Sequence, residues 1–533
     1  MRRWREVKPL TDKNANSIDR RQFLCGGLAA ASCALPASAR MMRNRRPAWP
    51  SARLTGAPAL KVDARQFMSL HQMRAWYEEL DDCGLRATGS TVQERYIDRL
   101  QERMMRVGMA HLRSEPVAFK SWTPSSWSVD VMSGTDAGPM PIAAYIPYSG
   151  ALPPEGTTGQ LHYIAPGAPM APGSLKGKIA LVQMTIPHTN LQPLYSMSHD
   201  RYDPDKLMPL DREYLRVWLS DIHARLPFIR AAAPLAVIAI LPLDDASAAG
   251  LYTPYDGVIR DCPGLYVSRT YGARLKLQAD AGTPVRVRLN ATAQPATSRN
   301  LLGVIPGRSK EMVLLHSHTD GPNGIEDNGP DLILSMAQYL SRIPQELLPR
   351  SILFVLTTGH FAGGVGSRNF VNRHRDDILD GVAASVTVEH VGAMDMAITP
   401  EGSFRSTGAM EPALVFMPPG AHVLSQGVVA GLVSGGMGGA FLAGPTNPHP
   451  QSMETASAWP GEGEYLWNGA GLPEANYITG PNYLFNAGYP TAKHVDFERM
   501  RRASMGFVDM VLGLSRIPAE TLKVTPPRDR PTA

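Results

Sequence analysis

Met312-Val-Leu-Leu-His-Ser-His-Thr-Asp320 opens the stretch that decides the fold, which runs to Gly392. This apolar strand leads into a loop that carries Glu326-Asp327-Asn328, and two further apolar strands end at His360-Phe361 and at Glu389-His390. In an open α/β sheet, ligands bind at the carboxyl ends of the strands. We therefore expect these polar side chains to meet in one crevice.

The composition is that of a globular protein with two or three domains. The chain has 533 residues, of which 44% are hydrophobic and 19% charged, so it has ample apolar surface to bury. The formal net charge of +5 is raised by an arginine-rich amino terminus and does not indicate nucleic-acid binding. No nucleic-acid-binding motif is present, and we expect no nucleic-acid partner.

The amino terminus has the pattern of a twin-arginine signal peptide, predicted for residues 1–39. Arg20-Arg21 is followed by a short apolar run at 25–35 and by the small residues Ala37-Ser38-Ala39. Ala31-Ser32-Cys33 is the alternative, a poor lipoprotein site. The apolar run is too short to span a bilayer, so we expect no transmembrane span in the mature chain. The predicted location is the periplasm or the exterior, and residues 40–60 are predicted to be a linker.

Two cysteines, Cys83 and Cys262, remain after removal of the signal. They can pair in an oxidising compartment or stay as free thiols, and the sequence does not decide between these states.

Periodicity divides the rest of the chain. A helix is predicted over 91–107, and short strands at 178–182, 236–240 and 285–289 indicate a mostly β module over 150–296. From residue 300 the pattern is α/β, with a helix over 331–343 and a last helix near 497–511. The Gly- and Pro-rich range between 392 and 481 is expected to be mainly loop, and 516–533 a disordered tail.

The strand-end residues suit a zinc site. His318, Asp327 and Glu389 supply one imidazole and two carboxylates, a reasonable ligand set for an ion with an open coordination position. Asp320, in a His-x-Asp pair with His318, would accept the other ring N–H and fix the tautomer. Polar residues at strand ends are common, so the residues by themselves leave open whether a metal binds.

Several motifs resemble the zinc aminopeptidase family that includes bacterial secreted aminopeptidases, glutamate carboxypeptidase and the transferrin receptor. The motifs are Arg86-Ala-Thr-Gly-Ser90, the run at 175–182, Asn300-Leu-Leu-Gly-Val-Ile-Pro-Gly307 and Gly366-Ser367. The resemblance implies a three-layer α/β zinc-exopeptidase-like domain formed by residues 61–149 and 297–515. It also implies that residues 150–296 are an inserted protease-associated domain.

The same resemblance implies an altered catalytic site. His318, Asp327 and Glu389 match the ligands of the first metal, whereas the family's pair of glutamates, general base then ligand, falls on His360-Phe361. The family's last histidine falls on Asn486, and His494 is the nearest histidine that can substitute. We therefore expect one zinc ion and not two. His360 stands at the position of the general base, with an ordinary pKa of roughly 6.5.

Two functions follow from this resemblance. The first is an exported metallohydrolase with a single metal and an altered base, which acts on peptides or related amides. The alternative is a catalytically inactive member that binds a ligand or a protein. Glu454, Glu462, Glu464 and His449 are either solvated loop residues or parts of a rebuilt site. The sequence does not indicate an oligomeric state.

Overall fold

The three strands that define the centre of the fold are present in the computed structural model. They are β12 (Ser309–His318), β13 (Arg350–Thr357) and β14 (Val382–Glu389), and β12 lies parallel between the other two. All eight residues of β13 and all eight of β14 are buried, as expected for strands covered on both faces. The predicted α/β class with a mixed sheet is confirmed.

The structure describes residues 62–186, 188–215, 221–445, 459, 461–479, 488 and 490–524. These belong to one unit, Ser51–Ala533, and the other unit, Met1–Pro50, lies outside the described residues together with the predicted signal peptide. Among the helices that the structure describes, none combines the length and apolar character that a bilayer span needs.

The mixed sheet continues on both sides of these strands. On one side β13 pairs antiparallel with β11 (Pro284–Ile305), and on the other β14 pairs parallel with β19 (Glu474–Thr479). Beyond β19 the order is β17 (Ala413–Phe416), β18 (Ala440–Ala443) and β7 (Ser198–Tyr202). The edge strand β7 therefore comes from within the range predicted as an insertion.

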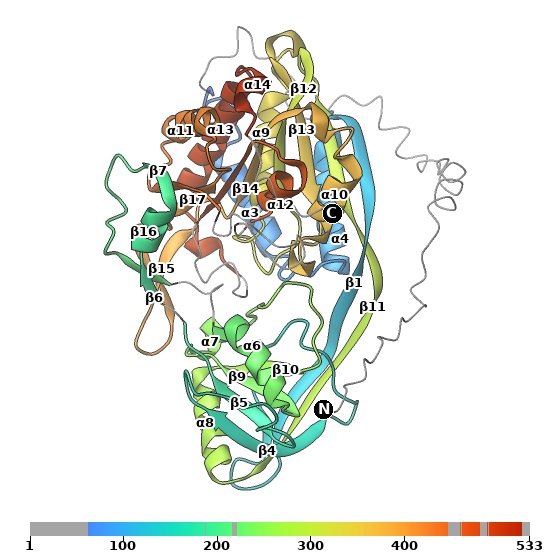
Figure 1. Ribbon diagram of the computed structural model, residues 1–533, viewed down its shortest axis with the longest axis vertical. Coiled ribbons are helices and arrows are strands. Elements are labelled where there is room, and N and C mark those ends of the chain that lie inside the picture. Colours follow the sequence, from blue (N-terminus) through green and yellow to red (C-terminus); the bar gives the residue numbers. More distant parts are fainter. Residues whose placement is uncertain are drawn as a thin grey trace, which may run out of the picture. The chain divides into compact units, whose positions relative to one another are not determined.

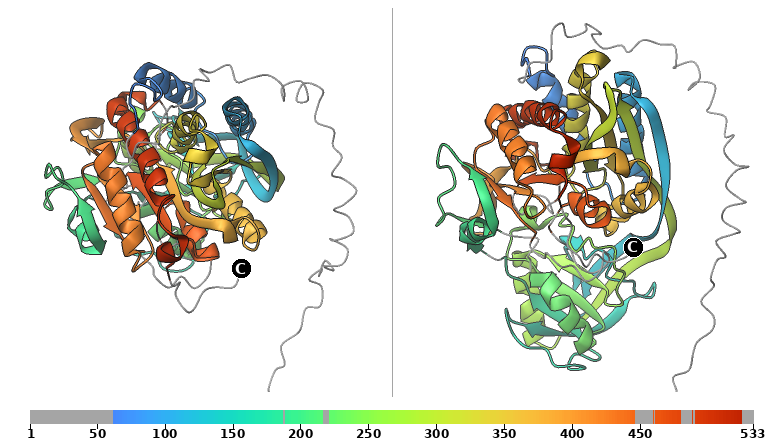
Figure 2. Two further views of the ribbon diagram at one scale, coloured as in Figure 1. Left: turned by 90° about the horizontal axis from the view of Figure 1, so that it is seen from above. Right: turned by 45° about the horizontal axis from the view of Figure 1, so that its top comes forward.

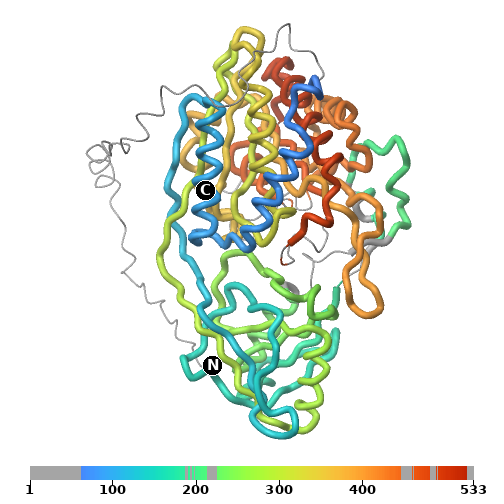
Figure 3. The backbone as a smooth tube through the Cα atoms, turned by 180° about the vertical axis from the view of Figure 1, so that it is seen from behind, coloured from blue at the N-terminus to red at the C-terminus, as the bar shows by residue number. Residues whose placement is uncertain are grey.

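Helices cover both faces of this sheet (Figures 1 and 3). On one face lie α3 (Leu70–Asp81), α4 (Thr91–Val107), α9 (Gly329–Leu340) and α13 (Phe497–Leu514), and on the other lie α10 (Val365–His374) and α12 (Gly463–Tyr465). Helix α4 has the predicted bounds because Ser90 caps its first turn, accepting from Gln93 N at 3.2 Å, and Gly108 ends it at φ 78°.

A long ribbon connects two parts of the sheet. Strand β1 (Ala110–Val131) pairs antiparallel with β11 from Ala110 opposite Val304 to Val131 opposite Val285 (Figure 1). The first residues of β11 pair with β4 (Thr157–Ile164) and its last five residues with β13. One strand thus crosses the boundary that the sequence predicts between residues 296 and 297.

The range 150–296 contains the predicted strands and also helices. Strands β4, β5 (Ile179–Gln183), β9 (Ala236–Ile240) and β10 (Gly264–Val267) are successive parallel neighbours. Parallel strands need crossover connections; α6 (Asp221–Ala232) lies in the connection from β5 to β9, whereas α8 (Arg269–Asp280) follows β10 and leads to β11. The smaller elements of this range are β6 (His188–Asn190), α5 (Gln192–Met197), β8 (Glu213–Leu215) and α7 (Asp245–Ala248). The short strands β2 (Gly138–Met140) and β3 (Ala144–Tyr145) precede it and pair with β1 and β10. The assignment to a protease-associated domain stays a prediction.

The range 392–481, expected to be mainly loop, is largely regular structure, and this expectation is wrong. Besides β17, β18, α12 and β19 it contains β15 (Met394–Ile398), β16 (Phe404–Met410), α11 (His422–Gly435) and the π-helical turn η4 (Leu466–Ala470). Helix α11 lies beside α13 (Figure 2). A Cβ on Gly435 would lie 3.0 Å from the Cα of Gly506, so the glycines allow close helix packing. The short helix α14 (Ala519–Leu522) lies in the range predicted as a disordered tail.

Candidate active site

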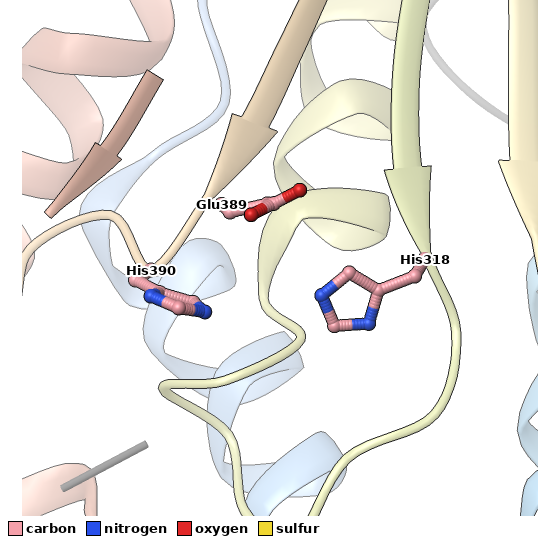
Figure 4. Close-up of side chains that lie close together, drawn as sticks. All are labelled: His318, Glu389 and His390. Atoms are coloured by element: carbon pink, nitrogen blue, oxygen red, sulfur yellow. The ribbon is translucent and has the colours of Figure 1, made fainter. Parts of the chain in front are cut away.

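Three buried side chains meet at the carboxyl ends of β12 and β14. His318 and Glu389 are the last residues of these strands, and His390 follows directly (Figure 4). Their possible ligand atoms all lie within 4.8 Å of one another, and their exposed fractions are 0%, 1% and 4%. The structure thus brings together two of the three predicted ligands, His318 and Glu389. Burial raises the pKa of Glu389 to about 7, against the opposing charges of His390 and His360.

His318 presents a ring nitrogen to this space. Its Nδ1 lies 2.9 Å from the backbone carbonyl oxygen of Asp320, so the N–H is assigned to Nδ1 and Nε2 carries a lone pair. Nε2 is buried and has no hydrogen-bond partner among the described residues. Burial and the neighbouring His360 and His390 hold the pKa of His318 well below 6.5, so the ring is neutral. A neutral imidazole with an unpartnered buried nitrogen is suited to bind a metal.

The prediction that the Asp320 carboxylate fixes the His318 tautomer is wrong, because the backbone carbonyl of the same residue does so. The carboxylate instead accepts from Thr88 Oγ1 at 2.6 Å and from the backbone N–H groups of His360 and Phe361 at 3.2 and 2.9 Å. Burial raises the pKa of Asp320 to about 6, although these hydrogen bonds oppose the shift. Asp320 therefore holds the turn that follows β13.

Asp327, the third predicted ligand, is paired with Arg86. Both side chains are fully buried; Arg86 Nε donates to Asp327 Oδ2 at 2.8 Å, and a second guanidinium nitrogen donates to Oδ1. Arg86 also donates to the backbone carbonyl oxygens of Asn323 and Leu80 at 2.6 and 3.1 Å. Asp327 is in neither group of side chains that, among the described residues, can hold a metal. Its assignment as a ligand stays a prediction.

His360 is flanked by carboxylates. Its ring stacks on that of His318 with centroids 4.2 Å apart, Nδ1 lies 2.7 Å from Glu462 Oε1, and Nε2 lies 3.7 Å from Glu326 Oε1. Burial would lower the pKa of His360, but the hydrogen bond and charge of Glu462 and the charge of Glu326 outweigh it and raise the pKa to about 10. A raised pKa favours the protonated ring, which has no lone pair with which to accept a proton. The assignment of His360 as the general base stays a prediction.

Glu462 lies beside His360 and Glu389, and the sequence left its role open. It is fully buried, its Oε2 accepts from Ser367 Oγ, and its backbone N–H donates to Glu389 Oε1 at 2.8 Å. Burial would raise the pKa of Glu462, but His360 and Ser367 lower it. Gly461 and Gly463 flank Glu462, and they are the signal in the sequence that this segment is closely packed. A Cβ on Gly463 would lie 2.4 Å from Glu474 Oε1.

Glu326 and His390 are residues that the sequence places near the site without giving them a role. Glu326 is 1% exposed, and its Oε2 lies 2.9 Å from His390 Nε2. It forms a second group of possible metal ligands with His318 and His360. The side chain of Asn323 accepts from the backbone N–H of Glu326 at 3.1 Å and holds this loop. The sequence signal that could have identified them is their position, because Glu326 directly precedes Asp327 and His390 directly follows Glu389.

The other histidines and the cysteines do not join these groups. His316 is buried between Thr387 and Thr357, each 3.1 Å from a ring nitrogen, and burial lowers its pKa to about 4. His494 lies half-buried in the turn η6 (Ala492–His494) and is in neither metal-binding group of the described residues. Three further candidates lie outside the described residues, namely His449, Glu454 and Asn486. The described cysteines Cys83 and Cys262 are free thiols.

Comparison with known proteins finds a family match for the central strands. Residues 300–414 match the sequence profile of Peptidase family M28. This range of the chain is similar to the M28 peptidases. The M28 match contains β12, β13 and β14 and therefore His318, Glu326, His360, Glu389 and His390. No curated protein matches the chain.

Three solved structures resemble the fold. A zinc aminopeptidase from Bacillus subtilis has 15% identity and a TM-score of 0.57, covering 83% of this chain and 94% of its own. A Peptidase M28 precursor from Shewanella amazonensis SB2B has 14% identity and a TM-score of 0.58, covering 86% and 100%. An aminopeptidase from Aneurinibacillus sp. strain AM-1 has 15% identity and a TM-score of 0.50, covering 85% and 94%. At these identities the likeness concerns the fold alone.

Proposed function

We propose that this protein is a zinc-dependent hydrolase of the aminopeptidase type that acts on peptides or related amides. The observation that carries the proposal is the buried Nε2 of His318, which has no partner among the described residues and faces Glu389 within the range similar to the M28 peptidases. A buried polar atom without a hydrogen bond is costly, so its presence favours a ligand at this point.

The donors present fit zinc. Imidazole nitrogen and carboxylate oxygen are its usual ligands besides thiolate, and both occur here on rigid strand ends. His318 and Glu389 would hold the ion. When bound, zinc polarises a carbonyl group and lowers the pKa of water.

We propose a single ion because Phe361 occupies the position expected for a ligand of the second. Its side chain is fully buried against the rings of Tyr255 and Tyr252, with centroids 4.7 and 5.6 Å away. The phenyl ring has no donor atom for a metal. Tyr148 Oη donates to the backbone oxygen of Phe361 and helps to fix its position.

The side chains around His318 have separable roles in this proposal. His360, held as an imidazolium by Glu462, supplies a fixed positive charge for the oxygen on which negative charge develops. Glu326, close to both His390 and His360, is the carboxylate placed to take a proton from the attacking water. Glu462 acts through His360 and is a positioning residue.

The experiment measures metal content and hydrolysis together. Purified protein is analysed for bound zinc and assayed against a panel of aminoacyl amides and acyl-amino-acid amides, beside His318→Ala. His374→Asn is the matched control, because His374 is also a buried histidine but lies outside the site. Its Nε2 is 2.9 Å from the carboxylate of Glu115. We expect zinc and hydrolysis in the wild type and the control, and neither in His318→Ala.

Protein that binds zinc but hydrolyses no member of the panel would support the alternative, a ligand-binding relative without activity. Protein that binds no zinc would contradict the hydrolase. Export by the twin-arginine route stays part of the proposal, since the predicted signal lies outside the described residues.

A further inference from the structure

We propose that His390, and not Asp327, completes the metal site, so that the ion is held by His318, Glu389 and His390. This inference rests on the proposed zinc site and names its third ligand. It changes the expected ligand set from one histidine and two carboxylates to two histidines and one carboxylate.

The geometry of the three side chains supports this set. Figure 4 shows the His318 and His390 rings on either side of the Glu389 carboxylate, around one space. Their ligand atoms lie within 4.8 Å of one another, and all three residues are buried. Two histidines and one glutamate form a known donor set of catalytic zinc sites, with the fourth position open for water or substrate.

The backbone at His390 accounts for the presence of two consecutive ligands. Successive side chains of a strand point to opposite faces, so Glu389 and His390 could not both face the site in extended conformation. His390 instead has φ 55°, in the left-handed region that residues other than glycine rarely adopt. Such conformations persist where the surroundings impose them and are frequent at functional sites.

The surroundings do impose this conformation. The Asn328 side chain accepts from Val391 N at 3.1 Å and donates to Val391 O at 3.0 Å, while Thr479 Oγ1 donates to His390 O. The carbonyl of His390 and the residue after it are thus held by side chains from other elements, and Glu389 before it is paired with Ile478 of β19. The carboxylate of Glu326, 2.9 Å from His390 Nε2, orients the ring.

Asp327 is held away from a ligand role. Both of its carboxylate oxygens accept from Arg86, whose guanidinium is fixed by three further backbone carbonyl oxygens, those of Leu80, Gly84 and Asn323. Coordination by Asp327 would require this buried pair to open and would leave the Arg86 charge without its carboxylate. Coordination by His390 would leave the Arg86–Asp327 pair intact.

The test uses the metal itself as readout. Zinc affinity is measured by competition with a chelator for wild type, His390→Ala and the paired variant Arg86→Met with Asp327→Asn, in which no charge is left unpaired. Loss of residues that only support a ligand costs 10- to 100-fold in affinity, so we expect more than about 100-fold for His390→Ala. We expect less than about tenfold for the paired variant, since it keeps all three ligands.

A second arm gives a signal that misfolding cannot produce. In the cobalt-loaded His390→Cys variant, a thiolate ligand would add a sulfur-to-cobalt charge-transfer band absent from the cobalt-loaded wild type. The same substitution at Asp327, made together with Arg86→Met, should give no such band. The thiols of Cys83 and Cys262 are common to all samples.

The outcomes separate the two levels of the proposal. If the paired variant loses zinc while His390→Ala keeps it, or if His390→Cys binds cobalt without the band, His390 is not a ligand and the zinc hydrolase proposal stands. If wild-type protein binds no metal, the proposed function fails, and this inference fails with it.

Discussion

The buried Arg86–Asp327 pair offers a sharp test of the structure. Both side chains are 0% exposed, so Arg86→Met would leave the Asp327 carboxylate without its partner in the interior, close to Glu326. Breaking a buried ion pair by removing one partner costs about 3–5 kcal/mol. We expect a loss of this size in the free energy of unfolding.

The measurement is urea-induced unfolding of wild type, Arg86→Met, Asp327→Asn and the double variant. The double variant should lose less than the sum of the single losses by about 1–3 kcal/mol, because it leaves no unpaired charge. Arg106→Met is the control: its pair with Glu102 is more than half exposed, and we expect a change within about 0.5 kcal/mol.

The pH dependence has a defined sign. Burial already raises the pKa of Asp327 above 3.8, and Arg86 opposes this shift. Removal of Arg86 raises the pKa further, so the loss in Arg86→Met should be largest at neutral pH and shrink as the pH falls and Asp327 takes up a proton. Additive single losses, or a loss of less than about 1 kcal/mol at neutral pH, would refute the buried pair.

Three further predictions concern the surroundings of the site. Protonated His360 contributes its full stabilisation below pH 6.5, and this contribution is lost as the pH rises through about 10. The stability difference between wild type and Glu462→Gln should therefore be largest just below pH 6.5 and shrink toward pH 10 in urea titrations. Gly257→Ala should destabilise the protein more than Gly177→Ala in thermal unfolding. The backbone strain is similar, at φ 70° and 77°, but only at Gly257 would the new Cβ meet backbone, 2.6 Å from Ala362; equal shifts would contradict this contact. Phe361→Ala should lower the free energy of unfolding by about 3–5 kcal/mol, and a loss below about 1 kcal/mol would show that the aromatic cluster is not packed as described.

The central strands and helix α4 could be predicted because local pattern determines them. Strands β12 to β14 are apolar runs buried on both faces, and α4 has apolar residues at helical spacing between a serine cap and a glycine. Helix α11 could not be found in this way. Its glycines face Gly506 and Met510 of α13, so their role appears only when the two helices are brought together.

In the candidate site, too, some residues follow from local pattern and others depend on distant contacts. His318 and Glu389 were identifiable because strand ends converge at one edge of a sheet. The raised pKa of His360 depends on Glu462, which comes from a segment 102 positions away in the chain, and no local pattern predicts that contact. The orientation of His390 depends on a left-handed backbone angle that the sequence does not specify.

The β1–β11 ribbon has a consequence for the order of folding. Its paired residues, from Ala110 with Val304 to Val131 with Val285, enclose the whole segment between them as a loop. Closing a long loop costs conformational entropy before the contacts form, and topologies rich in such distant pairings fold slowly. The segment between the two strands is therefore expected to collapse around its own parallel strands before β11 can align with β1. Only then can β13, and with it the turn that carries His360, take its place on the last residues of β11.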